Sequence, residues 1–89
     1  MKLFESNKYK EDFRKLPDEI QRKTIKALRL LIADIHHPSL RVKKVKGPAI
    51  EGLSNLLEAR INKDYRLFFS IIPETYVLIA CGKHDKYLK

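Results

Sequence analysis

The sequence contains little cysteine and little glycine, and each scarcity excludes a class of site. Cys81 is the single cysteine of the 89 residues, which excludes a disulfide framework and favours a cytosolic location. We interpret Cys81, inside the apolar run TYVLIACG, as a small core residue. The three glycines are scattered, so a glycine-rich phosphate loop is excluded. One cysteine and three histidines, two of them adjacent, give no zinc spacing.

Long apolar runs are also absent from the sequence. No segment approaches the roughly 18 consecutive apolar residues of a membrane span, and the first four residues are too short and polar for a signal peptide. The length predicts one small domain over residues 1–89.

Acidic residues are scarce relative to basic ones. Eleven Asp and Glu stand against 19 Lys and Arg, which gives a formal charge of +8. A charge of this size favours polyanionic partners such as nucleic acid, and an acidic protein partner would satisfy the same field.

Two amphipathic helices are predicted in the first half of the chain. KLFES reads as a short strand that ends at Ser6, an N-cap residue for a helix over NKYKEDFRKL. Pro17 ends that helix, and PDE starts a second one with a proline and two acids in its first turn. The second helix continues to HHP. Its apolar stripe consists of Ile20, Thr24, Ala27, Leu28, Leu31 and Ile35.

The second half of the chain predicts a sheet. Its strand-like runs are LRVKKVKG, LLEARIN, YRLFFSII and TYVLIACG, separated by residues 47–52, NKD and Pro73-Glu74. The predicted order is therefore βααββββ. This order describes an α+β domain with a mostly antiparallel sheet of four to five strands and the helical hairpin on one face.

The stretch EARINKDYRLFFS directs two arginines to the same place. Alternation puts Ile61 on one face of its strand, with Glu58 and Arg60 on the other. If NKD forms a tight loop, Ile61 pairs with Tyr65, and Arg60 then lies directly across from Arg66. Like charges directly opposite each other are destabilising, so the pair favours an anion. A salt bridge of these arginines with Glu58, which lies diagonally across from Arg66 and two residues from Arg60, is the structural alternative, and both could hold at once.

Two further basic groups flank this pair. RVKKVKG is either a phosphate-attracting edge or a solvated edge strand. In GKHDKY, pairing of the last two strands across Pro73-Glu74 sets Cys81 beside Arg66, so that His84 emerges just past it. Histidine can accept or donate a proton at neutral pH.

Four stretches of the chain, YKEDFRKLPDEIQRKTIKAL, HPSLRVKKVKG, EARINKDYRLFFSI and GKHDKY, resemble the RelE/ParE superfamily of bacterial and archaeal toxins from toxin–antitoxin systems. The resemblance covers nearly the whole chain. It implies a microbial-ribonuclease-like fold, with a helical hairpin on an antiparallel sheet. For the RelE branch it implies cleavage of messenger RNA in the ribosomal A site, whereas the ParE branch poisons DNA gyrase and lacks the ribonuclease residues.

The resemblance also implies roles for single residues. Arg66 falls at the arginine of the family's YRL, His84 at the position after GK that holds arginine or histidine, and Tyr87 near a C-terminal tyrosine used in catalysis. These residues favour the RelE branch. The chain departs from relatives that pair such a histidine with a glutamate near the second strand, because it has Ser39 to Val42 there.

A metal-independent mechanism follows from this reading. The RNA 2′-hydroxyl would attack the adjacent phosphorus, and Arg60 and Arg66 would stabilise the charge on the phosphorane oxygens. His84 would protonate the departing 5′-oxygen, and Tyr87 would stack on a base or assist proton transfer. No cofactor is needed, because the neighbouring hydroxyl is the nucleophile. The residues expected to bind RNA are Lys43, Lys44, Lys46 and Lys83.

Three alternatives remain beside the ribonuclease: a gyrase-directed toxin, a toxin that only binds its antitoxin, and a plain RNA-binding module. The expected protein partner is a cognate acidic antitoxin. Its amphipathic segment would lie on an apolar patch rimmed by positive charge, on the sheet face away from the helices. The residues predicted for this patch are Phe68, Ile72, Val77 and Ile79.

Overall fold

The computed structural model describes residues 1–45 and 55–83 of the chain. In chain order the elements are β1 (Lys2–Glu5), α1 (Asn7–Arg14), α2 (Asp18–Ala33), the 3₁₀ turn η1 (Pro38–Leu40), β2 (Lys43–Lys44), β3 (Leu57–Arg60), β4 (Tyr65–Ile72) and β5 (Thr75–Lys83). This order confirms the predicted α+β fold with two helices before the main strands.

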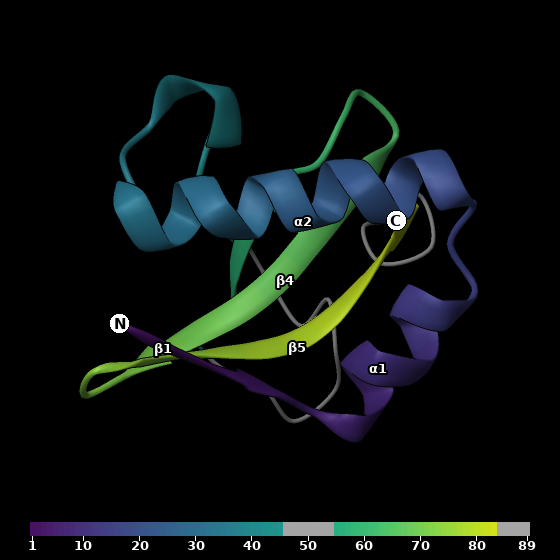
Figure 1. The fold of residues 1–89 in the computed structure, drawn as a ribbon. Helices are drawn as coiled ribbons and strands as arrows, with labels where there is room; N and C mark the ends of the chain where they lie inside the picture. Colours follow the sequence, from purple (N-terminus) through teal and green to yellow (C-terminus); the bar gives the residue numbers. More distant parts are fainter. Residues whose placement is uncertain (46–54, 84–89) are drawn as a thin grey trace.

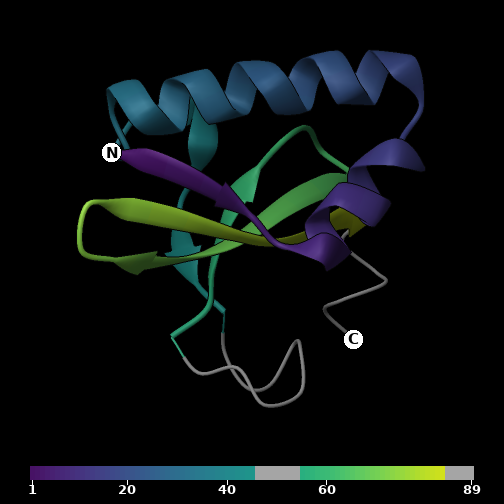
Figure 2. The same ribbon diagram turned by 60° about the horizontal axis from the view of Figure 1, so that its bottom comes forward.

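The strands form one five-stranded sheet in the order β1-β5-β4-β3-β2. The first strand runs parallel to β5, and the other neighbouring pairs are antiparallel. Helix α2 lies across one face of this sheet (Figure 1, Figure 2). The opposite face carries a second, smaller buried cluster of Leu56, Phe68 and Ala80. Among the described residues, no helix is both long and apolar enough to cross a membrane.

Ser6 begins α1 and ties it to the sheet. Its hydroxyl oxygen accepts a hydrogen bond from the Tyr9 backbone N–H at 3.1 Å and donates one to the Ile79 carbonyl at 3.0 Å. The predicted N-cap is therefore confirmed. Pro17 separates the helices as predicted, and α2 ends at Ala33, before the predicted HHP.

The main core lies between the helices and the sheet. Leu31 of α2 and Leu67 and Phe69 of β4 are fully buried there, and Cys81 is buried in the same cluster, as predicted for a small core residue. Tyr9 joins them from α1. Burial raises the pKa of its phenol well above the usual value, and the nearby Cys81 and Glu5 groups add to this rise.

A β-bulge interrupts the pairing of β4 with β5. Phe69 faces Leu78, whereas Phe68 faces Ala80, so Ile79 is an extra residue on β5. A bulge adds one residue to one strand and shifts every later pair by one position. Strict alternation along the sequence contains no signal for it.

The bulge corrects one prediction about the site. Arg66 faces Gly82, not Cys81, and Cys81 instead faces Leu67 and turns into the helix-side core. The prediction that Cys81 lies beside Arg66 is therefore wrong by one residue.

The strand predicted over LRVKKVKG is much shorter than expected. Only Lys43 and Lys44 pair with β3, because Leu40 belongs to η1 and Arg41 has a left-handed backbone with φ of 45°. A left-handed residue breaks an extended chain. Half of the outer edge of β3, at Ala59 and Arg60, therefore has no strand partner among the described residues.

We expect Ser6→Ala to lower the free energy of unfolding by about 1 to 2 kcal/mol, because it removes both the N-cap of α1 and the hydrogen bond to the bulge. Urea unfolding followed by circular dichroism measures this change. Ser39→Ala is the matched control, since Ser39 is exposed and its hydroxyl makes no hydrogen bond to a described residue. Equal losses in the two variants would contradict the role assigned to Ser6.

Candidate functional site

Four charged residues gather on the sheet face opposite the helices, and we call them the arginine face. Lys43 faces Glu58 across β2 and β3, and Arg60 faces Arg66 across β3 and β4. The second pairing confirms the register predicted from the hairpin sequence. Because Arg60 and Arg66 occupy directly opposed positions, the backbone places two arginines side by side on one face of the sheet.

A tight turn sets this register. The side-chain oxygen of Asn62 accepts hydrogen bonds from the backbone N–H groups of Asp64 at 2.8 Å and Tyr65 at 2.9 Å. Such a side-chain bond to the following backbone is typical of an Asx turn. The turn confirms the loop predicted for NKD and brings Tyr65 opposite Ile61, where the Ile61 N–H donates to the Tyr65 carbonyl at 3.0 Å.

The guanidinium of Arg66 is held by this turn. Its Nη1 donates to the carbonyl oxygens of Asn62 at 2.7 Å and Tyr65 at 3.0 Å. Its Nε lies 4.0 Å from Glu58 Oε1, and the side chain is 17% exposed. An arginine that is fixed in this way loses little further freedom when it binds an anion.

Glu58 is a buried counterion within the arginine face. Its residue exposure is 2%, and its Oε1 lies 3.5 Å from Lys43 Nζ as well as near Arg66. The predicted salt bridge between Glu58 and Arg66 is therefore present together with the arginine pair. Glu58 Oε2 is buried and has no hydrogen-bond partner among residues 1–45 and 55–83. The cost of removing this carboxylate from water is thus only partly offset by its two cations.

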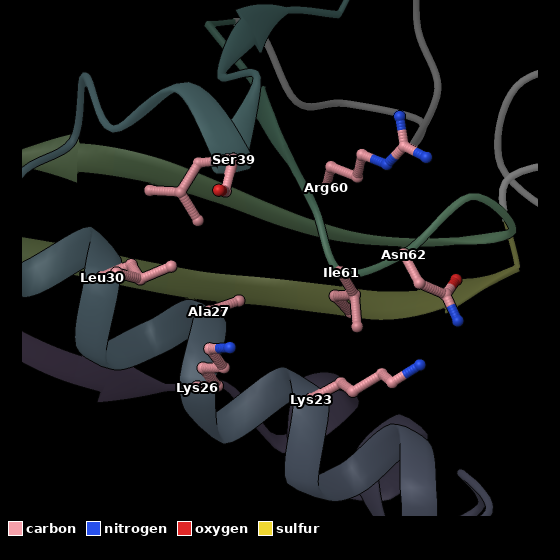
Figure 3. Close-up of a pocket in the computed structure, with 9 residues that line it drawn as sticks. Lys23, Lys26, Ala27, Leu30, Ser39, Arg60, Ile61 and Asn62 are labelled. Carbon is pink, nitrogen blue, oxygen red and sulfur yellow. The ribbon is translucent and has the colours of Figure 1, made fainter.

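Arg60 differs from Arg66 in its surroundings. It is half-buried, and no described residue forms an ion pair with it. In Figure 3 its guanidinium points away from the lysines of α2. The arginine face therefore combines one fixed cation with one that has no counterion among the described residues.

The other residues predicted to bind RNA do not all join this face. Lys44 pairs with Leu57 and Lys83 with Tyr65, and both partners belong to the helix-side core. Alternation therefore directs these two lysines to the other face. Lys83 lines a cavity on the α1 side. Three more predicted residues, Lys46, His84 and Tyr87, lie outside the described residues, so their roles stay predictions.

The apolar patch predicted for the antitoxin is smaller than expected. Phe68 is fully buried in a second small cluster with Leu56 and Ala80, so the expectation of an exposed Phe68 is wrong. Ile72 is 50% exposed, and Val77 and Ile79 are half-buried. Their role in binding stays a prediction.

Sequence reasoning missed an exposed aromatic beside this patch. Phe4 is 60% exposed and faces Val77 across the parallel pair of β1 and β5. The position of Phe4 beside this patch could have been predicted only from the pairing of β1 with β5, and local alternation does not predict which strands pair. Apolar surface near Ile72 and Val77 thus extends onto the edge strand.

A cavity of about 250 Å³ between α2, η1 and the end of β3 was also missed. Its polar lining comes from distant parts of the chain (Figure 3). In the sequence, Lys23 and Lys26 fit the solvent-exposed side of an amphipathic helix. No local sequence pattern indicates that they lie near β3. The polar and charged residues of this lining are Lys23, Lys26, Ser39, Arg60 and Asn62.

A sequence model described as the ParE toxin of type II toxin–antitoxin system, parDE, matches residues 5–86 of this chain. A search of curated proteins by sequence finds no significant match.

Several solved structures have a fold similar to that of this chain. The YoeB dimer from Staphylococcus aureus superposes with a TM-score of 0.74 at 17% identity, covering 94% of this chain and 97% of that one. The E. coli DinJ–YafQ toxin–antitoxin complex gives 0.76 at 14%, covering 98% and 96%. The archaeal RelE–RelB complex from Pyrococcus horikoshii OT3 gives 0.71 at 18%, covering 92% of each chain. At these identities the likeness establishes the fold.

We expect Glu58→Gln to tighten the binding of inorganic phosphate at the arginine face by about fivefold. The substitution keeps the side-chain shape and removes a negative charge about 4 Å from Arg66, an interaction worth on the order of 1 kcal/mol in a water-like dielectric. Titration of the Arg66 Nε–H NMR signal with phosphate measures the affinity.

Glu11→Gln is the control for that titration, because it removes the same charge from the exposed side of α1. If both variants bind phosphate equally well, Glu58 does not act as the counterion of this site.

Proposed function

The chain belongs to the ParE toxin family of type II toxin–antitoxin systems, and on that premise we propose that it is an endoribonuclease that cleaves messenger RNA on the ribosome. The observation that carries this proposal is the direct opposition of Arg60 and Arg66 on the sheet face away from α2. An enzyme that stabilises a phosphorane dianion would gain a preorganised anion site.

The chemistry needs little beyond this site. The RNA 2′-hydroxyl loses its proton to solvent water as its oxygen attacks the adjacent phosphorus. The bond to the 5′-oxygen then breaks, the 5′-oxygen takes up a proton, and the products are a 2′,3′-cyclic phosphate and a 5′-hydroxyl. Negative charge is greatest on the phosphoryl oxygens in the transition state. Arg66, fixed by two carbonyl oxygens, and Arg60 then bind the transition state more tightly than the substrate.

The proposed general acid is His84. In sequence it directly follows Lys83, the last residue of β5, and Gly82 on that strand faces Arg66. A group placed there would protonate the departing 5′-oxygen while the arginines hold the phosphorus. Tyr87, a few residues further on, would stack on a base or assist proton transfer. Lys43, beside Glu58 on the arginine face, would bind a neighbouring phosphate, and Lys46 would contact the RNA further along. Lys44 and Lys83, on the other face of the sheet, would attract the RNA only at longer range.

A gyrase-directed toxin, or one that only binds its antitoxin, is the second candidate. The family description names the ParE toxin, and Glu58 already neutralises part of the charge of Arg66 and Lys43. This candidate predicts intact messenger RNA. A gyrase-directed toxin would also give a changed plasmid topology in a gyrase assay.

We expect Arg66→Ala to slow message cleavage on programmed ribosomes by about a hundredfold, the effect of roughly 3 kcal/mol of lost transition-state stabilisation. Primer extension on the message measures the rate. Arg29→Ala is the matched control, because Arg29 is exposed on α2, on the other side of the sheet.

Thermal unfolding of both arginine variants separates lost catalysis from lost folding. An Arg66→Ala protein that is folded and cuts at the wild-type rate would sink the proposed mechanism.

The proposed protein partner is an acidic, amphipathic antitoxin segment that becomes ordered on binding. Its carboxylates would lie near Arg60 and Arg66, and its apolar residues would cover the exposed surface around Ile72, Val77 and Ile79. Binding there would block the site and relieve the repulsion between the arginines. The likeness to the DinJ–YafQ and RelE–RelB complexes supports an antitoxin partner of this general kind.

We expect the double charge reversal of Lys43 and Lys44 to glutamate to slow antitoxin association more than it speeds dissociation, because rim charges steer the encounter. Surface plasmon resonance at two salt concentrations measures both rates. The control reverses Lys10 and Lys15, which are exposed on the α1 side. If the association rate changes neither with this charge reversal nor with salt concentration, electrostatic steering by Lys43 and Lys44 is refuted.

A further inference from the structure

The cavity between α2, η1 and the end of β3 has the composition of an anion site. Its walls carry the amino groups of Lys23 and Lys26, the hydroxyl of Ser39 and the amide of Asn62. Figure 3 shows the two lysines on the α2 wall and Asn62 on the facing wall. None of the described residues that line it is acidic. The cavity therefore offers hydrogen-bond donors and positive charge without an internal counterion in its lining.

The two lysines have only weak interactions with the described acidic residues, so they are available to bind a ligand. Lys26 forms no ion pair with a described residue, and Lys23 pairs only with Glu19 at 3.5 Å. The Glu19 side chain is 72% exposed, and an exposed pair one helical turn apart is worth only about 0.3 to 0.5 kcal/mol. A phosphate that reached both amino groups would displace this pair.

The floor of the cavity indicates how a ligand would be recognised. It is formed by the aliphatic side chains of Ala27, Leu30, Leu40 and Ile61. None of the described lining residues is aromatic, so a base would find no ring on which to stack. Amino, hydroxyl and amide donors around an aliphatic floor suit the phosphate and sugar of a nucleotide more than its base.

Arg60 makes the cavity continuous with the arginine face. Arg60 is one of the residues that line the cavity, but its guanidinium points away from the α2 lysines (Figure 3). In the sheet, Arg60 of β3 is paired with Arg66 of β4. Strand β2 covers β3 only at Leu57 and Glu58, so the edge beyond them is open among the described residues. A flexible polyanion could therefore pass over this edge and contact both places.

We propose that this cavity is a second phosphate-binding subsite for RNA, occupied by a nucleotide next to the phosphate held at the arginine face; its assignment to a substrate strand rests on the proposed endoribonuclease function. Single-stranded RNA carries one phosphate per nucleotide, so a strand anchored at Arg60 presents further phosphates nearby. A cavity of about 250 Å³ admits one such group, whereas an acidic protein segment would need the apolar surface near Ile72 and Val77. Recognition at the subsite is independent of sequence.

The test uses the full chain and a 2′-O-methylated RNA oligonucleotide, which binds but cannot supply the attacking hydroxyl. Lys23→Ala/Lys26→Ala is compared with Arg22→Ala/Arg29→Ala. Both double variants remove two positive charges from exposed positions of α2, and alanine preserves the helix. Arg22 and Arg29 do not line the cavity. Fluorescence anisotropy over a range of salt concentrations gives the affinity and its salt dependence.

We expect the lysine variant to lose about tenfold in affinity and the arginine control less than about threefold. The slope of log affinity against log salt should fall by about 0.7 in the lysine variant, because the loss of one phosphate contact to a single strand removes roughly that amount. Equal losses and equal slopes in the two variants would overturn the subsite. So would a lysine variant that binds RNA normally but loses its antitoxin.

Message-free ribosomes, tested in parallel, identify the source of the phosphate. A selective loss with the oligonucleotide assigns the subsite to the substrate strand, and a selective loss only with ribosomes assigns it to ribosomal RNA. Both outcomes support an RNA phosphate. If the wild-type protein binds RNA through the cavity but cleaves no message, the proposed endoribonuclease function is refuted and the proposed subsite is supported. If the protein cleaves messages but the two double variants bind RNA equally well, the subsite is refuted and the endoribonuclease function is supported.

Discussion

The opposition of Arg60 and Arg66 is the constraint around which the functional face is arranged. Two cations at directly paired positions of an antiparallel sheet repel each other, and the pairing persists because other groups compensate. The Asn62 turn fixes the register, the carbonyls of Asn62 and Tyr65 hold one guanidinium, and buried Glu58 supplies a negative charge. The resulting site is short of negative charge, which an incoming phosphate would provide.

The compensation also shapes what the site can do. Glu58 lies near Arg66 and Lys43 at the cost of a buried carboxylate oxygen that has no partner in the described part of the chain, and Arg66 is held in place before a ligand arrives. Preorganised charge is more effective in catalysis than charge that must be gathered. The same counterion weakens attraction to any anion. The arginine face therefore has a lower affinity for the ground-state substrate but a charged group that is already positioned for the transition state. This combination suits a catalyst better than a simple RNA-binding surface.

Local patterns predicted much of this arrangement, and long-range packing decided the rest. The Arg60 and Arg66 pairing followed from alternation and a short turn, and the Ser6 cap from a polar residue before an amphipathic run. The bulge at Ile79, which moved Gly82 opposite Arg66, left no trace in alternation. The burial of Phe68 and the cavity shared by α2 and β3 depend on segments that meet only in the fold. Strand periodicity predicts on which face of the sheet a side chain lies, but it does not predict which other segment packs on that face.

The chemistry of the cut ends tests the central claim most directly. Wild-type protein is added to ribosomes programmed with a defined message, and the ends at the cleavage point are identified by enzymatic labelling and mass spectrometry. Attack by the 2′-hydroxyl at an arginine-stabilised phosphorus predicts a 2′,3′-cyclic phosphate on one fragment and a 5′-hydroxyl on the other. An intact message, or fragments that carry a 5′-phosphate, would contradict the account.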